Sequence, residues 1–81
     1  MEVQVTLMSR DGCHLCEVAR SELERILPDY GLRATVVDVD ADDELRFEYG
    51  DRVPVVLLDG KEHGYFTVEE KRLRAALDAR R

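Results

Sequence analysis

A strand that turns directly into a helix is predicted by Val3-Gln4-Val5-Thr6-Leu7-Met8-Ser9-Arg10-Asp11-Gly12-Cys13-His14-Leu15-Cys16. The first residues of this stretch alternate apolar and polar side chains, as a strand does, and apolar residues at helical spacing follow it. The chain's only two cysteines lie at the junction. A helix begins with unpaired N–H groups and a positive dipole end, which favour a thiolate. The junction therefore predicts a redox-active Cys-x-x-Cys pair.

Within this pair, Cys13 is predicted to be the catalytic nucleophile and Cys16 the catalytic resolving thiol. Dipole effects are largest at the first residue of a helix, and Cys16 lies one turn further on. His14 is an auxiliary candidate, since an imidazolium would stabilise the Cys13 thiolate; the alternative is a solvent-facing residue without a role. The cysteines could also be two reduced thiols without a role, or metal ligands, although two thiols are too few to hold an ion.

Size and charge narrow the classes of function. The chain has 81 residues, a net charge of −6, 44% hydrophobic and 37% charged residues, which suit a single domain over residues 1–81. The negative charge argues against nucleic acid and anionic membranes, and no apolar stretch reaches the roughly 18 residues of a membrane span. Residues 1–4 lack the features of a signal peptide, so we expect the protein in the cytoplasm. In that compartment a cysteine pair is more often catalytic or metal-binding than structural. We also expect a monomer.

The first strand is predicted over residues 2–8 and the first helix over 14–27, ended by Pro28, Asp29 and Gly31. The predicted buried face of the helix comprises Leu15, Val18, Ala19, Leu23, Ile26 and Leu27. A second strand is expected over 33–39. A short acidic helix then begins at Asp40 as N-cap and ends at Gly50, with Leu45 and Tyr49 on one face. Capping explains the acidic residues 38–44 more simply than a cation site does.

The apolar run 53–58 predicts a third strand that is buried on both faces. Asp59-Gly60 is a hairpin turn signal, and a polar edge strand over 61–64 follows it. Residues 67–70 form a capping box that starts a last helix to Ala79, with Arg80 and Arg81 at its C-terminal dipole end. The apolar residues expected to face inward from this helix are Val68, Leu73, Ala76 and Leu77. The order βαβαββα predicts an α/β fold with one four-stranded mixed sheet flanked by helices.

This order, with Cys-x-x-Cys after the first strand and a proline before the third, resembles the thioredoxin superfamily. The short chain is similar to glutaredoxins, and more narrowly to short bacterial glutaredoxin-like proteins, through residues 13–16, 37–42 and 52–55. The resemblance implies a thioredoxin-like, glutaredoxin-type fold. It also implies that the Val53–Pro54 bond is cis, that Pro54 packs against the cysteine pair, and that the backbone of Val53 pairs with substrate or glutathione.

Four departures from the glutaredoxin pattern bear on glutathione. Arg52 stands where glutaredoxins usually have threonine, and His14 and Leu15 stand where they tend to have proline and an aromatic residue. Gly64 matches the first glycine of the glutathione-binding pair, but Tyr65 replaces the second. Thr67 stands near the position of an aspartate. The resemblance implies that substrate or glutathione binds at Val53, Pro54, Gly64 and Thr67. Because of the departures at Tyr65 and Thr67, we expect glutathione to bind weakly. Tyr65 and Phe66 are interpreted as core residues, and His63 as an edge-strand residue with no catalytic role.

Three functions compete on the sequence. The first is a thiol–disulfide oxidoreductase that acts on protein or glutathione disulfides with no tightly bound cofactor. Its reductant is left open between glutathione and a thioredoxin-type reductase. The second is a non-catalytic thioredoxin-fold module that senses redox state or binds a partner. The third is a carrier of a metal or iron–sulfur cluster.

Overall fold

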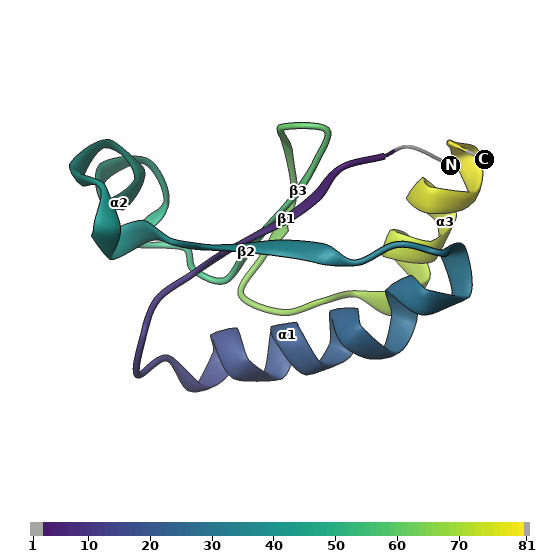
Figure 1. Cartoon of the computed structure of the whole chain (residues 1–81), viewed down its shortest axis with the longest axis horizontal. Coiled ribbons are helices and arrows are strands. Elements are labelled where there is room, and N and C mark those ends of the chain that lie inside the picture. The colour runs from purple at the N-terminus through teal and green to yellow at the C-terminus, as the bar shows by residue number, and fades with distance from the viewer. Residues whose placement is uncertain (1–2, 81) are drawn as a thin grey trace.

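The computed structural model describes residues 3–80, and its helices and strands follow the predicted order βαβαββα (Figure 1). In chain order the elements are β1 (Val5–Ser9), α1 (His14–Ile26), η1 (Leu27–Tyr30), β2 (Ala34–Asp38), η2 (Val39–Ala41), α2 (Asp43–Tyr49), β3 (Val55–Leu58), β4 (Lys61–Tyr65) and α3 (Glu70–Ala79). The expected strand start at Glu2 and the role of Arg81 lie outside the described residues. The α/β fold class is confirmed.

The four strands form one mixed sheet in the order β2-β1-β3-β4. β1 and β2 are parallel, with Leu7 opposite Val36, while β3 is antiparallel to both β1 and β4. Because β1 and β2 run the same way, the segments that follow them emerge at the same end of the sheet. Figure 1 shows this at the left, where the turn into α1 and the helix α2 both lie.

The sheet separates two apolar clusters. The larger cluster, on the side of α1 and α3, comprises Val3, Val5, Leu7, Ala19, Leu23, Ile26, Leu27, Val56, Leu58, Leu73 and Leu77. The smaller cluster lies against α2 and comprises Met8, Val39, Val55 and Leu57, with Leu45 and Tyr49 packed on it. β3 contributes alternate residues to each cluster, so all four are buried, as the apolar run predicted. The shared face of Leu45 and Tyr49 is also confirmed.

The hairpin between β3 and β4 is confirmed. Asp59 has φ 52° and Gly60 φ 82°, the left-handed values that a type I′ turn requires of both central residues. The Asp59 carboxylate accepts a hydrogen bond from the backbone N–H of Gln4 at 2.9 Å. The turn is therefore anchored to the start of the central strand.

The predicted buried face of α1 is wrong in its first turns. Leu15 and Val18 are each 44% exposed, whereas Cys16 is 2% exposed and continues the face through Ala19 and Leu23. Since successive helical residues turn by about 100°, a face that contains Cys16 turns Leu15 away from the core. The helix ends at Ile26, and η1 continues the chain to a left-handed Gly31.

Two predicted helix starts also need correction. The N-cap of α2 is Asp42, whose carboxylate accepts from the N–H groups of Glu44 and Leu45, and Asp40 is not a cap of this helix. The last helix begins at Glu70 without a side-chain cap, so the predicted capping box does not form. Gly50 does end α2 in a right-handed conformation, and glycine is favoured there because a Cβ atom would collide with the carbonyl oxygen of Arg46. At the other end of α3, Arg80 donates to the carbonyl of Ala76 at 2.9 Å, as expected for a C-terminal cation.

An ion-pair network fastens α3 to α1. The Glu70 carboxylate accepts from Arg25 of α1 at 2.7 Å and from Arg74 at 2.9 Å. The hydrogen bond from Arg25, which has the larger effect, and the one from Arg74 lower the pKa of Glu70 to about 2. Arg74 also pairs with Asp29 of η1 at 3.0 Å. The helix that carries the cysteines is thus held to the C-terminal helix by charge as well as by packing.

Candidate redox site

A disulfide joins Cys13 to Cys16, with the two Cα atoms 5.2 Å apart. Cys13 is the N-cap of α1 and has extended backbone angles, φ −104° and ψ 109°. Its sulfur accepts a hydrogen bond from the backbone N–H of Cys16 at 3.2 Å, and its carbonyl accepts from Glu17 at 3.2 Å. An N–H group of the first helical turn, which has no partner within the helix, therefore donates to the Cys13 sulfur. That donor and the helix dipole would stabilise a thiolate in the reduced protein.

The two cysteines differ in accessibility. Cys13 is half-buried, whereas Cys16 is 2% exposed and packs on the buried face of α1. An incoming disulfide can approach Cys13 and cannot approach Cys16 without moving the helix. This difference supports the division of roles predicted from the sequence.

Arg10, the arginine that precedes the pair most closely in sequence, does not supply a cation to Cys13. Arg10 is turned away: its Nε and Nη2 donate to the Asp40 carboxylate and its Nη1 donates to the carbonyl of Gly50, each at 3.0 Å. This pairing lowers the pKa of Asp40 and raises that of Arg10. His14 is exposed on the first turn of α1. The N–H donor at the helix start is the stabilising group that the structure shows at the Cys13 sulfur, and the role of His14 stays a prediction.

Arg10 was not predicted as a site residue, and its role is to position the loop. It lies three residues before Cys13 and ties that loop to residues on both sides of α2. A sequence signal exists, because Arg10 and Asp40 each follow closely after one of two parallel strands. Their opposite charges therefore meet at one end of the sheet.

The expected cis bond between Val53 and Pro54 is confirmed. Pro54 is fully buried, and its carbonyl accepts from the N–H of Phe66 at 2.8 Å. Val53 is half-buried, and within residues 3–80 its backbone N–H and C=O have no hydrogen-bond partner. The backbone of Val53 is therefore free to pair with a bound molecule.

Gly64 and Thr67 meet in one open hollow of about 480 Å³. The other residues that line it are Glu62, His63, Tyr65, Phe66, Glu69 and Arg72. Thr67 is exposed, and its N–H donates to the carbonyl of Tyr65 at 2.8 Å. Phe66, which lines this hollow, also donates its backbone N–H to the carbonyl of Pro54. The structure thus groups Gly64 with Thr67, while Val53 does not line the hollow.

The interpretation of Tyr65 and Phe66 as core residues is wrong. They are 52% and 45% exposed, and their rings stack edge to face with centroids 5.0 Å apart. Tyr65 ends the edge strand β4, and Phe66 follows it with a left-handed φ of 66°, so neither ring is covered by a neighbouring element. His63 is half-buried on the same strand, and burial lowers its pKa, helped by Arg72 and Arg80.

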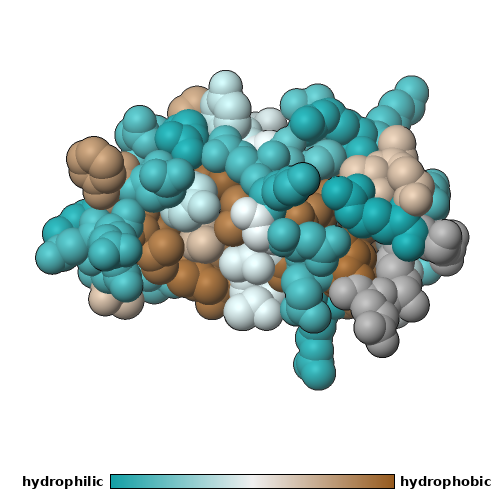
Figure 2. Space-filling view, turned by 90° about the horizontal axis from the view of Figure 1, so that it is seen from above, coloured by the Kyte–Doolittle hydropathy of each residue, from teal (hydrophilic) through white to brown (hydrophobic). Residues whose placement is uncertain are grey.

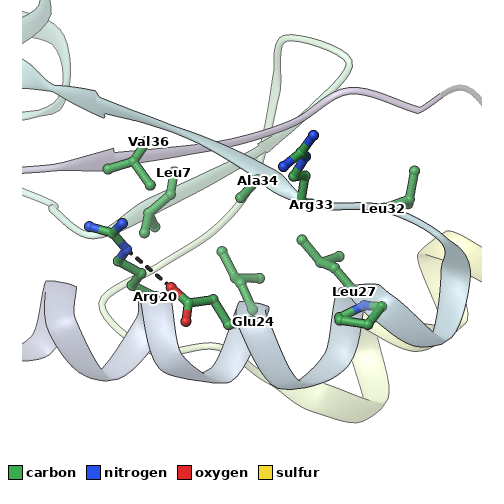
Figure 3. Close-up of a pocket in the computed structure, with 10 residues that line it drawn as sticks. Leu7, Arg20, Glu24, Leu27, Leu32, Arg33, Ala34 and Val36 are labelled. Carbon is green, nitrogen blue, oxygen red and sulfur yellow. Dashed lines mark hydrogen bonds and ion pairs between the residues drawn. The ribbon is translucent and has the colours of Figure 1, made fainter.

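A separate apolar hollow of about 240 Å³ lies between α1 and β2 (Figure 3). Leu7, Leu27 and Val36 line it, and the 3.2 Å ion pair between Arg20 and Glu24 stands on its α1 side. It contains none of the predicted site residues. The described residues hold no group of three or more His, Cys, Asp or Glu side chains placed to bind a metal. No helix within residues 3–80 has the length and apolarity to cross a bilayer.

Comparisons with known sequences give one family match and several similar curated proteins. A family model described as glutaredoxin-like domain (DUF836) matches residues 4–78. The uncharacterized protein Rv0508 of Mycobacterium tuberculosis is 44% identical over 77 residues, covering 89% of this chain and 79% of the relative. The uncharacterized protein Mb0520 of Mycobacterium bovis matches to the same extent.

Solved structures agree with the fold. Protein Ne2328 from Nitrosomonas europaea has a TM-score of 0.83 at 26% identity, over 94% of this chain and 92% of that one. The target protein XcR50 from X. campestris has a TM-score of 0.76 at 38% identity, over 93% and 96%. Fasciola hepatica thioredoxin, at 22% identity, has a TM-score of 0.69 over 99% of this chain and 82% of its own. This last similarity concerns the fold alone.

Proposed function

The chain belongs to the glutaredoxin-like domain family, and on this premise we propose that it is a thiol–disulfide oxidoreductase. The observation that carries the proposal is the Cys13–Cys16 pair at the start of α1, with one sulfur accessible and the other buried. A structural disulfide would need no such asymmetry. A helix start beneath the accessible sulfur is also the environment that lowers a thiol pKa.

The proposed reaction begins with the reduced protein. The Cys13 thiolate attacks one sulfur of a partner disulfide, the partner's S–S bond breaks, and its other sulfur leaves as a thiolate that takes up a proton. Cys16, as thiolate, then attacks the Cys13 sulfur and releases the partner's second thiol. The partner gains two electrons and two protons, and the protein is left with its internal disulfide. An external thiol donor must then reduce Cys13–Cys16 for another cycle.

The surroundings of the pair support this sequence of steps. The N–H of Cys16 already donates to the Cys13 sulfur, so the thiolate needs little rearrangement to be stabilised. Because Cys16 is buried, its reaction is effectively limited to the mixed disulfide at Cys13. The unpaired backbone of Val53 and the exposed rings of Tyr65 and Phe66 are available to hold an incoming chain.

The substrates we propose are protein or glutathione disulfides, with no resident cofactor, a monomeric protein and a cytoplasmic setting where dithiols persist. Glutathione is expected to bind weakly. Tyr65 occupies a position where a glycine would let backbone approach the ligand, and Thr67 offers a hydroxyl in place of a carboxylate. Glutathione is therefore proposed as a reductant of low affinity, with a reductase dithiol as the alternative donor.

A turnover assay tests the proposal. The protein is supplied with dithiothreitol and with 2-hydroxyethyl disulfide, a small uncharged substrate, and the formation of 2-mercaptoethanol is followed over time by chromatography. Many turnovers per molecule are expected for the wild type and none above background for Cys13→Ser, with Glu24→Gln, an exposed residue further along α1, as a folded control. Release of a single equivalent followed by arrest would contradict catalysis and favour a redox-sensing module.

A further inference from the structure

We propose that the outer face of α2 docks a cationic partner protein whose disulfide reacts at Cys13, with Phe47 as the central apolar contact. This inference rests on the proposed oxidoreductase function and names the partner class of the same site. It starts from an exposed aromatic ring, then uses the charges around that ring and the position of α2 relative to the disulfide.

Phe47 is 91% exposed, far more than the other large apolar side chains on the surface. Helix geometry explains its direction: Leu45 and Tyr49 pack on the smaller apolar cluster, and Phe47, about 200° around from Leu45, must face outward. Folding therefore gains nothing from a phenylalanine here. Large aromatic side chains are, however, enriched among the residues that dominate the energy of protein interfaces.

The charges around Phe47 select the partner. Asp43, Glu44, Glu48 and Asp51 are all exposed, and Figure 2 shows the α2 end of the surface as largely hydrophilic. Of these four carboxylates, only Asp43 and Asp51 have ion-pair partners within residues 3–80. A partner surface with lysine or arginine around an apolar contact would complement this face in charge.

Helix stability does not account for all of these residues. Asp43 and Glu44 lie in the first turn of α2, where the helix dipole favours negative charge. Glu48 lies in the last turn, where the dipole disfavours negative charge, and it stands next to Phe47. Phe47 is thus the residue of α2 that folding leaves unexplained, and Glu48, although its charge also acts on Arg52, adds a carboxylate that a cationic partner would use.

The position of α2 connects this face to the disulfide. The loop that carries Cys13 and the segment that carries α2 follow two parallel strands, so both lie at one end of the sheet (Figure 1). Arg10 joins them directly, through Asp40 before α2 and the carbonyl of Gly50 after it, at 3.0 Å each. A protein that covers α2 therefore lies at the same end of the sheet as the loop that carries Cys13, and must extend past that end to reach the redox pair.

Two disulfide-cyclised peptides of equal length serve as probes, one with lysines and leucines flanking its cysteines and one with glutamates and leucines. The ratio of their kcat/KM values is measured with dithiothreitol as reductant, at low salt and at about 0.5 M salt, where charges are screened within a few ångströms. We expect the wild type to prefer the lysine peptide about tenfold at low salt and to lose the preference at high salt. Phe47→Ala and the double variant Glu44→Gln/Glu48→Gln should each reduce the rate with the lysine peptide about fivefold.

Matched controls separate docking from chemistry. Val36→Thr and Glu24→Gln alter an exposed apolar residue and an exposed carboxylate away from α2, and should leave the preference unchanged. Turnover of 2-hydroxyethyl disulfide should be the same in every variant. Equal rates for the two peptides, or equal effects of the α2 variants and the controls, would overturn the docking inference while the proposed function stands.

A binding measurement keeps the inference testable if no variant turns over any disulfide, the result that would refute the proposed function. A cysteine-free version of the lysine peptide is titrated into the oxidised protein, and backbone amide shifts are recorded by NMR. Shifts that centre on residues 43–51 and vanish in Phe47→Ala would support docking at α2. Shifts that centre elsewhere, or none at millimolar peptide, would overturn it.

Discussion

Two leucines on α1, each truncated to alanine separately, should lower the free energy of unfolding by very different amounts. Leu23 is 1% exposed within the larger apolar cluster, whereas Leu15, two turns earlier on α1, is 44% exposed. Leu→Ala at a fully buried position costs about 2.7–5.0 kcal/mol, because transfer energy is lost and a cavity remains. For Leu23→Ala we take about 3 kcal/mol, which lowers Tm by roughly 12–24 °C in a domain of this size. For Leu15→Ala we expect less than about 1 kcal/mol.

The assay is urea unfolding of the oxidised proteins, followed by far-UV circular dichroism. The slope of unfolding free energy against urea should stay unchanged, so the shift in midpoint reports stability. Equal losses for the two variants would refute the reasoning, because they would mean that Leu15 is as buried as Leu23. A larger loss for Leu15→Ala would refute the described orientation of α1 outright.

Three further predictions concern protons and glutathione. The native pKa of Glu70, about 2, lies below its ordinary 4.5, so its ion pairs stabilise the fold above pH 4.5 and are lost as the pH falls toward 2. Glu70→Gln should therefore flatten the acid limb of stability against pH, measured by urea unfolding, while Glu24→Gln should not. The pKa of His63 is lowered below 6.5, so the unfolded chain binds more protons there and stability should rise with pH up to about that value. His63→Gln should remove this rise, and a rise of the same size in the variant would assign it to other groups. Glutathione titrated into Cys16→Ser should shift amides near Val53, Gly64 and Thr67 only at millimolar concentration; saturation at micromolar concentration would refute weak binding.

The parts of the fold that local chemistry determines could be predicted from the sequence. The alternation before the cysteines, the apolar run 55–58 and the turn at Asp59-Gly60 each predict one structure, because strand burial and left-handed turn geometry admit few residue types. The start of α2 was harder. Residues 38, 40, 42 and 43 are all aspartates, and which one caps the helix depends on where the chain bends. The bend accompanies the pairing of Asp40 with Arg10, a contact between segments far apart in sequence.

The buried face of α1 shows a different limit. Hydrophobicity alone assigns Leu15 to the core, but Cys16 fills that place and packs as an apolar residue. Counting Cys16 as apolar gives the spacing 16, 19, 23, 26, which fits a helix face better. Tyr65 and Phe66 were misassigned because an edge strand leaves its rings uncovered, and hydrophobicity does not report which strand is at the edge.

The cysteine pair itself was predictable, since a helix start next to a thiol is a local feature. The loop contact of Arg10 required the parallel order of the first two strands, and the exposure of Phe47 required the burial of Leu45 and Tyr49. Both could be inferred once the topology was assumed, because each follows from geometry. The free backbone of Val53 could not, since it depends on which hydrogen bonds the neighbouring strands leave unmade.

The sharpest test of the oxidoreductase proposal is mass spectrometry of two variants exposed to glutathione disulfide near neutral pH. Cys16→Ser keeps the accessible thiol at the helix start and should accumulate a stable mixed disulfide with glutathione. Cys13→Ser keeps only the buried thiol and should remain unmodified over the same time. Equal modification of the two variants, or modification of Cys13→Ser alone, would contradict the assignment of Cys13 as the attacking thiol.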